Sequence, residues 1–385
     1  MFDIEYPKPA EKIILSAFHF SYEDQKLFDE DIAEMVMLCR TAGAKVVDTI
    51  IQKGSKPRAA TYLGTGKLKE ISEKMKENSC TTLVVDAELT PAQIRNIERI
   101  ISGKVLDRNQ LILDIFAIHA KTNEAKIQVE LAQMNILYPR LTHAWSHFSK
   151  QVGGIGTRGP GEKQLEVDRR LVQKKISDLK KRLKKIERSR EIQRSGRNDI
   201  YKATLVGYTN VGKSTILNAL SGSDVLVENK LFATLDTATR KLFIDPIGDI
   251  IISDTVGFLR KLPHQLVASF RSTLEVVNEA DILLIIMDAS SNWSMQQLET
   301  VDSVLDELKV EKKNRLIIFN KCDLLTDSLR KKDLLIKYPE ALFVSAFQKE
   351  TMDNLKSIIK ESVEQISRER EKARIVAQKT REVTW

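Results

Sequence analysis

Residues 207–214 read GYTNVGKS, after the apolar run ATLV and before the helix-forming run STILNAL. This is the G-x-x-x-x-G-K-[ST] phosphate-loop pattern in a strand–turn–helix setting. Gly207 and Gly212 let the backbone fold around phosphates and present N–H groups, and the helix start adds partial positive charge. Lys213 is expected to reach the terminal phosphates, and the Ser214 hydroxyl to bind Mg²⁺. The stretch therefore predicts a nucleotide-binding α/β domain.

The rest of this region alternates between strand-like and helix-like segments. The strand-like runs are YKATLVG (201–207), KLFID (241–245), DIIISD (249–254), DILLIIMD (281–288), RLIIFN (315–320) and ALFVSA (341–346). Helices are expected around 213–222, 263–279, 293–309 and 352–366. Because the strands are almost continuously apolar, they are expected to be buried on both faces of one sheet. We predict a doubly wound domain over residues 200–366, followed by a short basic tail over 367–385.

The choice of nucleotide is indicated by NKCD at 320–323, which closes the strand RLIIF. The Asp323 carboxylate is placed to accept hydrogen bonds from N1 and N2 of guanine, and adenine lacks those donors, so adenine would leave the carboxylate unpaired. The Lys321 stem can lie over the base, and Asn320 can tie this loop to the phosphate loop. The backbone N–H of Ala346, in the SAF stretch after the next strand, is placed to hold the base.

The phosphate end of the site is indicated by DTVG at 254–257. Asp254 is placed to hold Mg²⁺ through water, and the Gly257 N–H to meet the γ-phosphate. LFATLD, at 231–236, would be the mobile switch, with Thr234 as a second Mg²⁺ ligand. Many GTPases place a glutamine after the DxxG glycine to orient the attacking water, but here that position is Phe258, so slow intrinsic hydrolysis is expected. The four motifs, in this order, resemble the translation-factor-like class of small GTPase domains.

These segments supply the candidate site residues. The nucleotide-binding set is Gly207, Tyr208, Thr209, Asn210, Val211, Gly212, Lys213, Ser214, Phe232, Ala233, Thr234, Leu235, Asp236, Asp254, Thr255, Val256, Gly257, Asn320, Lys321, Cys322, Asp323, Ser345, Ala346 and Phe347. The candidate catalytic residues are Lys213, Thr234 and Gly257. The candidate Mg²⁺ ligands are Ser214 and Thr234.

The first 110 residues show a βαβ rhythm. KIILSAFH, KVVDTIIQ and TTLVVDAE are strand-like, and residues 24–43 and 90–103 are helix-like. Strands that alternate with helices favour a parallel sheet. We therefore expect a small parallel α/β subdomain over residues 1–110.

Residues 111–196 are expected to form a helical hairpin. One helix, within 111–141, has a face marked by Ile127, Leu131, Met134 and Tyr138, and Pro139 is predicted to end it. The second runs from Glu162 to about Arg194, with a seam of Val172, Ile176, Leu179, Leu183 and Ile186. A glycine-rich tip loop, about 150–161, joins them, so the helices are expected to pair antiparallel. The alternative is a single-helix linker with a flexible hinge.

Composition restricts the classes of protein. No secretory signal is visible, and the longest apolar runs are of strand length, so neither secretion nor a membrane span is expected. Three scattered cysteines show no metal-binding spacing and favour a reducing, cytoplasmic setting. The net charge is +8, and residues 162–199 hold 14 Lys or Arg against 7 Asp or Glu, so most of the excess sits on the second hairpin helix. Such a face attracts polyanions.

Nearly the whole chain resembles the HflX family of GTPases. The resemblance is carried by GYTNVGKSTILNAL, LFATLD, SDTVGF with LPHQLVASFRSTLE, the upstream GGIGTRGPGE…QLE…DRR, YLGTGKLKEI at 62–71, VVDAELTPAQIRNIE at 84–98, and residues 105–142. It implies a cytosolic GTPase that binds the ribosome, chiefly the large subunit and its rRNA, and is stimulated there. Separately, we expect a monomer. Some members split stalled or idle ribosomes under stress.

The resemblance also implies that the hairpin carries its glycine-rich tip into the RNA-walled peptidyl-transferase region. Basic side chains would contact phosphates. They are Arg158, Arg169, Arg170, Lys174 and Lys175. Aromatic rings near the tip would either stack on bases or pack at the hairpin base. They belong to His143, Trp145, His147 and Phe148.

Asn210 suggests a further cofactor. GTPases with asparagine at this phosphate-loop position often use a bound K⁺ to stabilise charge, which would compensate for Phe258; alternatively, Asn210 only caps the loop. The chain also departs from the usual family pattern, with Lys163, Val167, Thr237 and Ala238 where threonine, threonine, proline and threonine are common.

Other classes of function remain as alternatives. A regulatory GTPase acting away from the ribosome, in signalling or at a membrane surface, would use the basic helices against acidic lipid; no lipidation signal supports it. A structural RNA-binding protein with a silent nucleotide site is opposed by the intact motif residues. A phosphate-loop ATPase or kinase is opposed by NKCD.

Overall fold

The computed structural model describes residues 10–144, 160–194, 200–222, 231–232, 238–260, 276–310, 314–325 and 328–383. The chain forms two compact units, Met1–Ile186 and Glu187–Trp385. None of the described helices is both long enough and apolar enough to span a membrane.

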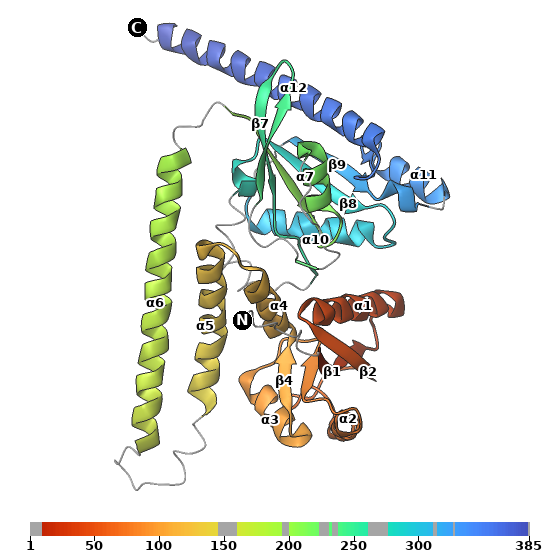
Figure 1. Cartoon of the computed structure of the whole chain (residues 1–385), viewed down its shortest axis with the longest axis vertical. Coiled ribbons are helices and arrows are strands. Elements are labelled where there is room, and N and C mark those ends of the chain that lie inside the picture. Colours follow the sequence, from red (N-terminus) through yellow and green to blue (C-terminus); the bar gives the residue numbers. More distant parts are fainter. Residues whose placement is uncertain are drawn as a thin grey trace, which may run out of the picture. The chain divides into compact units, whose positions relative to one another are not determined.

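The N-terminal unit is built on a four-stranded parallel sheet (Figure 1). Its strands, in the spatial order β2-β1-β3-β4, are β1 (Glu11–Phe20), β2 (Ala44–Gly54), β3 (Thr82–Val85) and β4 (Lys104–Asp107). The helices between them are α1 (Gln25–Thr41), α2 (Thr65–Glu77) and α3 (Pro91–Ile101). The predicted small parallel α/β fold is confirmed. β4 and α2 were not predicted, because a four-residue strand and a lysine-rich helix give weak periodic signals.

Local sequence accounts for α3. Thr90 forms a capping box with Gln93 at its N-terminus, and Pro91 lies in the first turn. Ile94, Ile97 and Ile101 lie on its buried side. They join an apolar core with residues of β1, β3 and α2. Amphipathic spacing thus attaches this helix to the sheet.

An ion-pair cluster joins α1, the residue that follows β3 and the start of α4 (Arg108–His119). The guanidinium of Arg108 donates to Asp86 at 2.9 Å and also pairs with Glu34. Its side chain is 4% exposed, as is that of Asp86. The two carboxylates raise the pKa of Arg108 against the opposing effect of burial, so the guanidinium is charged. Removing it would take away the cation that pairs with the buried carboxylate of Asp86 and with Glu34.

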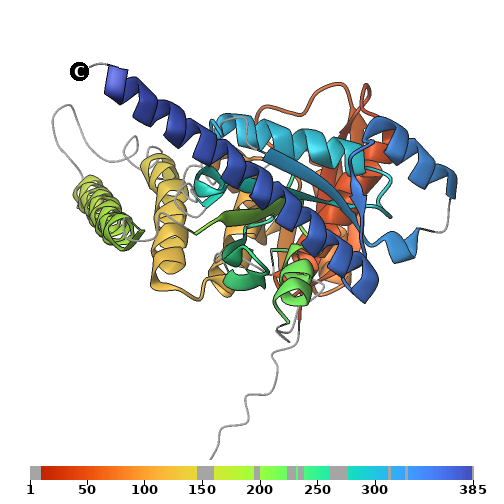
Figure 2. The same cartoon turned by 90° about the horizontal axis from the view of Figure 1, so that it is seen from above.

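The antiparallel hairpin is formed by α5 (Asn123–Ala144) and α6 (Pro160–Arg194), which run side by side (Figures 1 and 2). Ile127, Leu131 and Leu179 form its buried core. Ile176, Leu183 and Ile186 of the predicted seam join Met134 around it. The ion pair of Lys175 with Glu130 at 2.6 Å links the helices further.

The helical face predicted from Ile127 to Tyr138 lies on α5. It is preceded by a separate helix: α4 ends at His119, and α5 starts afresh with Thr122 Oγ1 accepting from the Ala125 N–H at 3.1 Å. One expectation for α5 was wrong. Pro139 does not end α5, which continues to Ala144. The proline removes one helix donor. Contacts across the hairpin hold this turn against α6, since the Tyr138 hydroxyl accepts from Arg169 and Gln173.

The C-terminal unit contains a six-stranded sheet in the order β10-β9-β8-β5-β7-β6. The strands are β5 (Lys202–Gly207), β6 (Thr239–Ile244), β7 (Gly248–Asp254), β8 (Ile282–Asp288), β9 (Asn314–Asn320) and β10 (Leu342–Phe343). Among the described strands of this sheet, only β6 runs antiparallel, against β7. The described helices are α7 (Lys213–Ser221), α10 (Ser294–Glu307), α11 (Ser328–Lys337) and α12 (Lys349–Val383), with a 3-10 turn at Cys322–Leu324. The predicted doubly wound fold is confirmed.

The last helix is longer than expected. Residues 367–385 were predicted to be a tail, but α12 runs as one helix to Val383 (Figure 2). Arg370 supplies a reason, since its guanidinium pairs with Asp281 and lies 5.1 Å from the ring centre of Tyr201. α11 was not predicted, and ALFVSA contributes only two strand residues. Of the helix expected at 263–279, only residues 276–279 are described, and they are helical.

Candidate functional site

The phosphate loop lies at the point in the sheet where the order of successive strands reverses. β5 is the strand from which neighbours are added on both sides, β8 on one and β7 on the other. Open α/β sheets bind ligands at the carboxyl ends of strands at such a point. The sequence GYTNVGKS connects the carboxyl end of β5 to α7. The loop and its motif therefore occupy the position at which this fold binds ligands.

Both loop glycines are required by close packing. A Cβ atom on Gly207 would lie 2.3 Å from the Ile286 carbonyl oxygen of the neighbouring strand. Gly212 has φ +91°, and a Cβ there would lie 2.3 Å from the side-chain nitrogen of Asn320. A side chain at either position would displace a strand or the NKCD loop.

Lys213 is held inside the loop. Its ammonium donates to the carbonyl oxygens of Tyr208 at 2.9 Å and Gly207 at 3.3 Å. Burial lowers its pKa to about 8, while the charge of Asp254 acts in the opposite direction. A bound anion would favour the charged ammonium in the same way that Asp254 does. This is the electrostatic setting of a phosphate-binding lysine.

Ser214 and Asp254 form the oxygen-rich part of the site. The Ser214 hydroxyl donates to Asp254 Oδ2 at 2.6 Å, and Asp254 is fully buried at the end of β7. Hydroxyl and carboxylate oxygens are the ligand types that Mg²⁺ prefers, so these residues fit a magnesium ion. The second predicted ligand, Thr234, lies outside the described residues, as do Ala233, Leu235 and Asp236. Phe232 is described and buried.

The DTVG segment is bonded directly to the phosphate loop. The Thr209 N–H donates to the Phe258 carbonyl at 2.8 Å, and the Phe258 N–H donates to Gly207 at 3.1 Å. The Phe258 side chain is 1% exposed and belongs to the apolar core with Val206 and Leu283. The phenyl ring is thus part of the core, and it has no polar group that could orient water.

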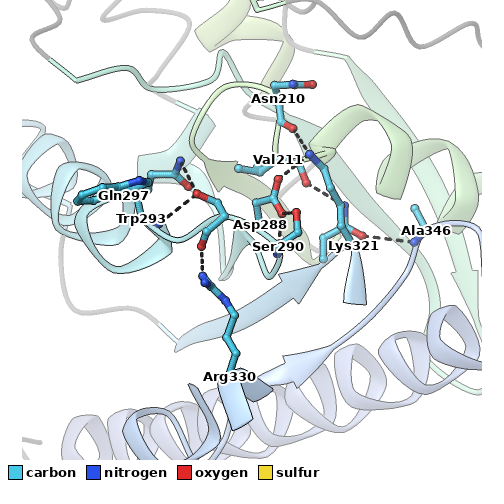
Figure 3. A network of polar contacts seen from close by, with 11 residues as sticks. Asn210, Val211, Asp288, Ser290, Trp293, Gln297, Lys321, Arg330 and Ala346 are labelled. Atoms are coloured by element: carbon cyan, nitrogen blue, oxygen red, sulfur yellow. Dashed lines mark hydrogen bonds and ion pairs between the residues drawn. The ribbon is translucent and has the colours of Figure 1, made fainter. Parts of the chain in front are cut away.

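The NKCD loop is tied to the phosphate loop by two side chains (Figure 3). The Asn320 amide donates to the Val211 carbonyl at 2.8 Å, and its oxygen accepts from the Ala346 N–H at 3.3 Å. The Lys321 ammonium donates to the Asn210 carbonyl at 2.8 Å. Asp323 is exposed and Ser345 is buried, while Phe347 is 84% exposed.

Sequence reasoning missed two residues of this network. Asp288, at the end of β8, binds the Lys321 ammonium through Oδ2 at 2.6 Å, and its Oδ1 accepts from the Ser290 N–H and hydroxyl (Figure 3). Arg330 of α11 donates to carbonyls of the loop after β8, including that of Ala289 at 3.0 Å. An aspartate closing an apolar strand was a usable signal for Asp288. Nothing local marks Arg330, because its contacts span about forty residues of sequence.

The basic side chains predicted on the second hairpin helix are all exposed. Arg169 lies 5.6 Å from the ring centre of Tyr138, Arg170 pairs with Glu166 at 2.7 Å, and Lys175 pairs with Glu130. Exposed ion pairs of this kind contribute little to stability. Arg158, Trp145, His147, Phe148 and the side chain of His143 lie outside what is described.

Three family models match consecutive parts of the chain. They are described as GTP-binding GTPase N-terminal (residues 29–117), GTP-binding GTPase Middle Region (119–197) and 50S ribosome-binding GTPase (202–321).

Among curated relatives, the GTPase HflX of Flavobacterium psychrophilum is 43% identical over 377 residues, covering 92% of this chain and 91% of that protein. The GTPase HflX of Escherichia coli K12 is 41% identical over 320 residues, 83% of this chain and 74% of that protein. The crystal structure of SsGBP with GDP superposes with a TM-score of 0.53 at 27% identity, covering 93% of this chain and 99% of that one. The resemblance seen in the sequence is thereby confirmed, and the chain belongs to the HflX family of GTPases.

Proposed function

We propose that GTP binds at the carboxyl ends of β5, β7 and β9 and that the nucleotide state controls attachment to the large ribosomal subunit. The observation that supports this most is the convergence of the three motifs: DTVG and NKCD are each hydrogen-bonded to the phosphate loop, which lies at the carboxyl end of β5. Family membership gives the reaction, which is hydrolysis of GTP.

Each motif has a role in the proposed complex. Lys213 and the backbone N–H groups of residues 207–214 hold the β- and γ-phosphates, and the Gly257 N–H meets the γ-phosphate. Asp323 accepts from the guanine edge, Lys321 lies along the base, and the SAF loop closes over it. Ser214 and Thr234 hold Mg²⁺, with Asp254 behind them. Bound Mg²⁺ would neutralise charge that develops between the β- and γ-phosphates.

We also propose K⁺ as a stimulating ion at Asn210. The support is limited to the residue type and to its place in the loop, where its φ is +62° and its carbonyl faces Lys321. Hydrolysis measured in KCl should be at least several-fold faster than in NaCl at equal ionic strength. Equal rates in the two salts would leave Asn210 with the role of a loop cap.

The ribosome is the proposed partner, and separation of its subunits the proposed outcome. The model that matches residues 202–321 is described as a 50S ribosome-binding GTPase, which supports the large subunit as the target. The exposed basic face of α6 is suited to rRNA phosphates. A cytoplasmic location and a monomeric state complete the proposal.

Sedimentation of intact ribosomes with the purified protein tests this. With a non-hydrolysable GTP analogue, the protein should migrate with the large subunit and the intact-ribosome peak should shrink; with GDP, it should remain at the top of the gradient. Binding without a smaller intact peak would limit the function to binding. Absence from the ribosome in both states would favour the alternative, a regulatory GTPase acting elsewhere.

A variant sharpens the test. Xanthine carries an acceptor where guanine carries the N2 donor, so Asp323→Asn should exchange guanine preference for xanthine. The variant should then sediment with the large subunit in a xanthosine triphosphate analogue and not in the GTP analogue. This result would show that the nucleotide acts on this protein and not on the ribosome.

A further inference from the structure

Thr209, the third residue of the phosphate loop, has a buried hydroxyl that the fold does not use. The residue is 5% exposed, and its Oγ1 has no hydrogen-bond partner among the described residues. A buried hydroxyl without a partner lowers stability, and valine would fill the same space without that cost. Such a group points to a partner that arrives with a ligand.

The position of Thr209 identifies that ligand. An ideal Cβ on Gly257 would lie 2.7 Å from Thr209 Cα, 2.8 Å from its Cγ2 and 2.9 Å from the Lys213 ammonium nitrogen. Thr209, the DTVG glycine and the phosphate-binding lysine therefore surround one small volume. In phosphate-loop proteins this lysine reaches the β- and γ-phosphates, and the DxxG glycine faces the γ-phosphate. The Thr209 side chain thus lies at the γ-phosphate end of the site.

Two other polar side chains of this region, those of Lys213 and Ser214, already have partners. The Lys213 ammonium donates to two loop carbonyls, and Ser214 donates to Asp254. Phe258, at the position where a glutamine would orient water, is packed into the core. The site therefore needs another polar group near the γ-phosphate, and Thr209 has one.

We propose that Thr209 is a catalytic residue whose hydroxyl donates a hydrogen bond to a γ-phosphoryl oxygen of GTP during hydrolysis. Water forms a bond to the γ-phosphorus as the bond to the β–γ bridging oxygen breaks, giving GDP and inorganic phosphate; the Thr209 proton is not transferred. The hydrogen bond stabilises negative charge on the γ-phosphoryl oxygens, as preorganised donors do in other sites. This role rests on the proposed GTP site.

Two substitutions separate the hydroxyl from the shape of the side chain. Thr209→Val keeps the shape and removes the hydroxyl, and Thr209→Ser keeps the hydroxyl and removes the methyl group. Single-turnover hydrolysis of GTP should fall by about 10- to 100-fold in the valine variant, toward the lower end of what one such donor contributes. The serine variant should stay within about three-fold of wild type, and GDP affinity should change little in both.

Thermal unfolding of the nucleotide-free protein provides a second readout, because the melting temperature should not fall together with the rate of hydrolysis. The valine variant should melt at the wild-type temperature or above it, since an unpaired buried hydroxyl has been removed. A slower enzyme that is at least as stable is the signature of a catalytic group. If valine prevents folding, Thr209→Ala gives the same comparison with serine.

Three results would overturn the inference. Wild-type hydrolysis by the valine variant would show that the hydroxyl has no catalytic role. Equal losses of rate in the valine and serine variants would assign the effect to the methyl group or to packing. A wild-type protein that binds no GTP would refute the proposed function itself and the inference with it.

Discussion

Replacing Asp288 by asparagine should weaken nucleotide binding, although Asp288 is not among the residues proposed to contact the nucleotide. The carboxylate holds the Lys321 ammonium at 2.6 Å and accepts two hydrogen bonds from Ser290 through its other oxygen. Asparagine has one acceptor oxygen in place of two. Whichever way the amide turns, either Lys321 or Ser290 therefore faces an N–H₂ group. Lys321 would lose its position between Asp288 and the Asn210 carbonyl.

The size of the effect follows from burial. Hydrogen bonds to charged groups contribute about 1.5–3 kcal/mol. The Lys321 side chain is 26% exposed and that of Asp288 14%, so water replaces part of what is lost. We expect a loss of about 1–1.5 kcal/mol, which is about a 5- to 12-fold increase in the Kd for GDP.

A fluorescent GDP analogue in stopped-flow measurements gives both rate constants, and the loss should appear mainly as faster dissociation. Asp302→Asn is the matched control, because Asp302 forms an ion pair with Arg315 in the same unit with side chains 45% and 30% exposed. A Kd for Asp288→Asn within two-fold of wild type, or an equal change in both variants, would refute the positioning argument.

Four further outcomes are expected. Arg108→Met should reduce the free energy of unfolding by about 3–5 kcal/mol in urea titrations, because it removes the cation that pairs with the buried Asp86 carboxylate and with Glu34; a loss below about 1 kcal/mol would contradict this. Leu179→Ala should cost about 2–4 kcal/mol in the same assay, and an unchanged midpoint would show that the hairpin core is not needed. Burial raises the pKa of Cys39 from 9.0 to about 12, so between these pH values the unfolded chain alone ionises this thiol and stability falls as pH rises. At pH 8, iodoacetamide followed by mass spectrometry should label the half-buried Cys322 well before Cys39; equal labelling would contradict this burial.

The parts of the fold that could be predicted depend on local pattern. Strands buried on both faces are read directly from apolar runs, and the phosphate loop from eight adjacent residues. The hairpin seam followed from the spacing of apolar residues, and its partners lie on α5 as expected. These features are encoded within single segments, so no knowledge of neighbours was needed.

The features that could not be predicted depend on contacts between distant segments. Pro139 reads as a helix end, but the Tyr138 hydroxyl binds side chains of α6 more than thirty residues away. Residues 367–383 read as a charged tail, but Arg370 pairs with Asp281 across 89 positions. Arg330 and Asp288 are charged residues of the kind found on any protein surface. Their role is seen only when the positions of the loops that they anchor are known. Propensity is a weak guide wherever such tertiary contacts decide the outcome.

The same long-range contacts explain how the site behaves as one unit. The phosphate loop is bonded on one side to DTVG through backbone groups of Thr209 and Phe258. On the other side it is bonded to NKCD through Asn320 and Lys321. Because both sets of bonds end on a single loop of eight residues, a shift caused at the γ-phosphate reaches the base-binding residues without passing through the sheet. Coupling of this kind requires that Thr209→Val and Asp288→Asn interact. The effect of the double variant on the release rate of a non-hydrolysable GTP analogue, which carries the γ-phosphate, should then differ from the product of the single effects, whereas residues that act independently would combine multiplicatively.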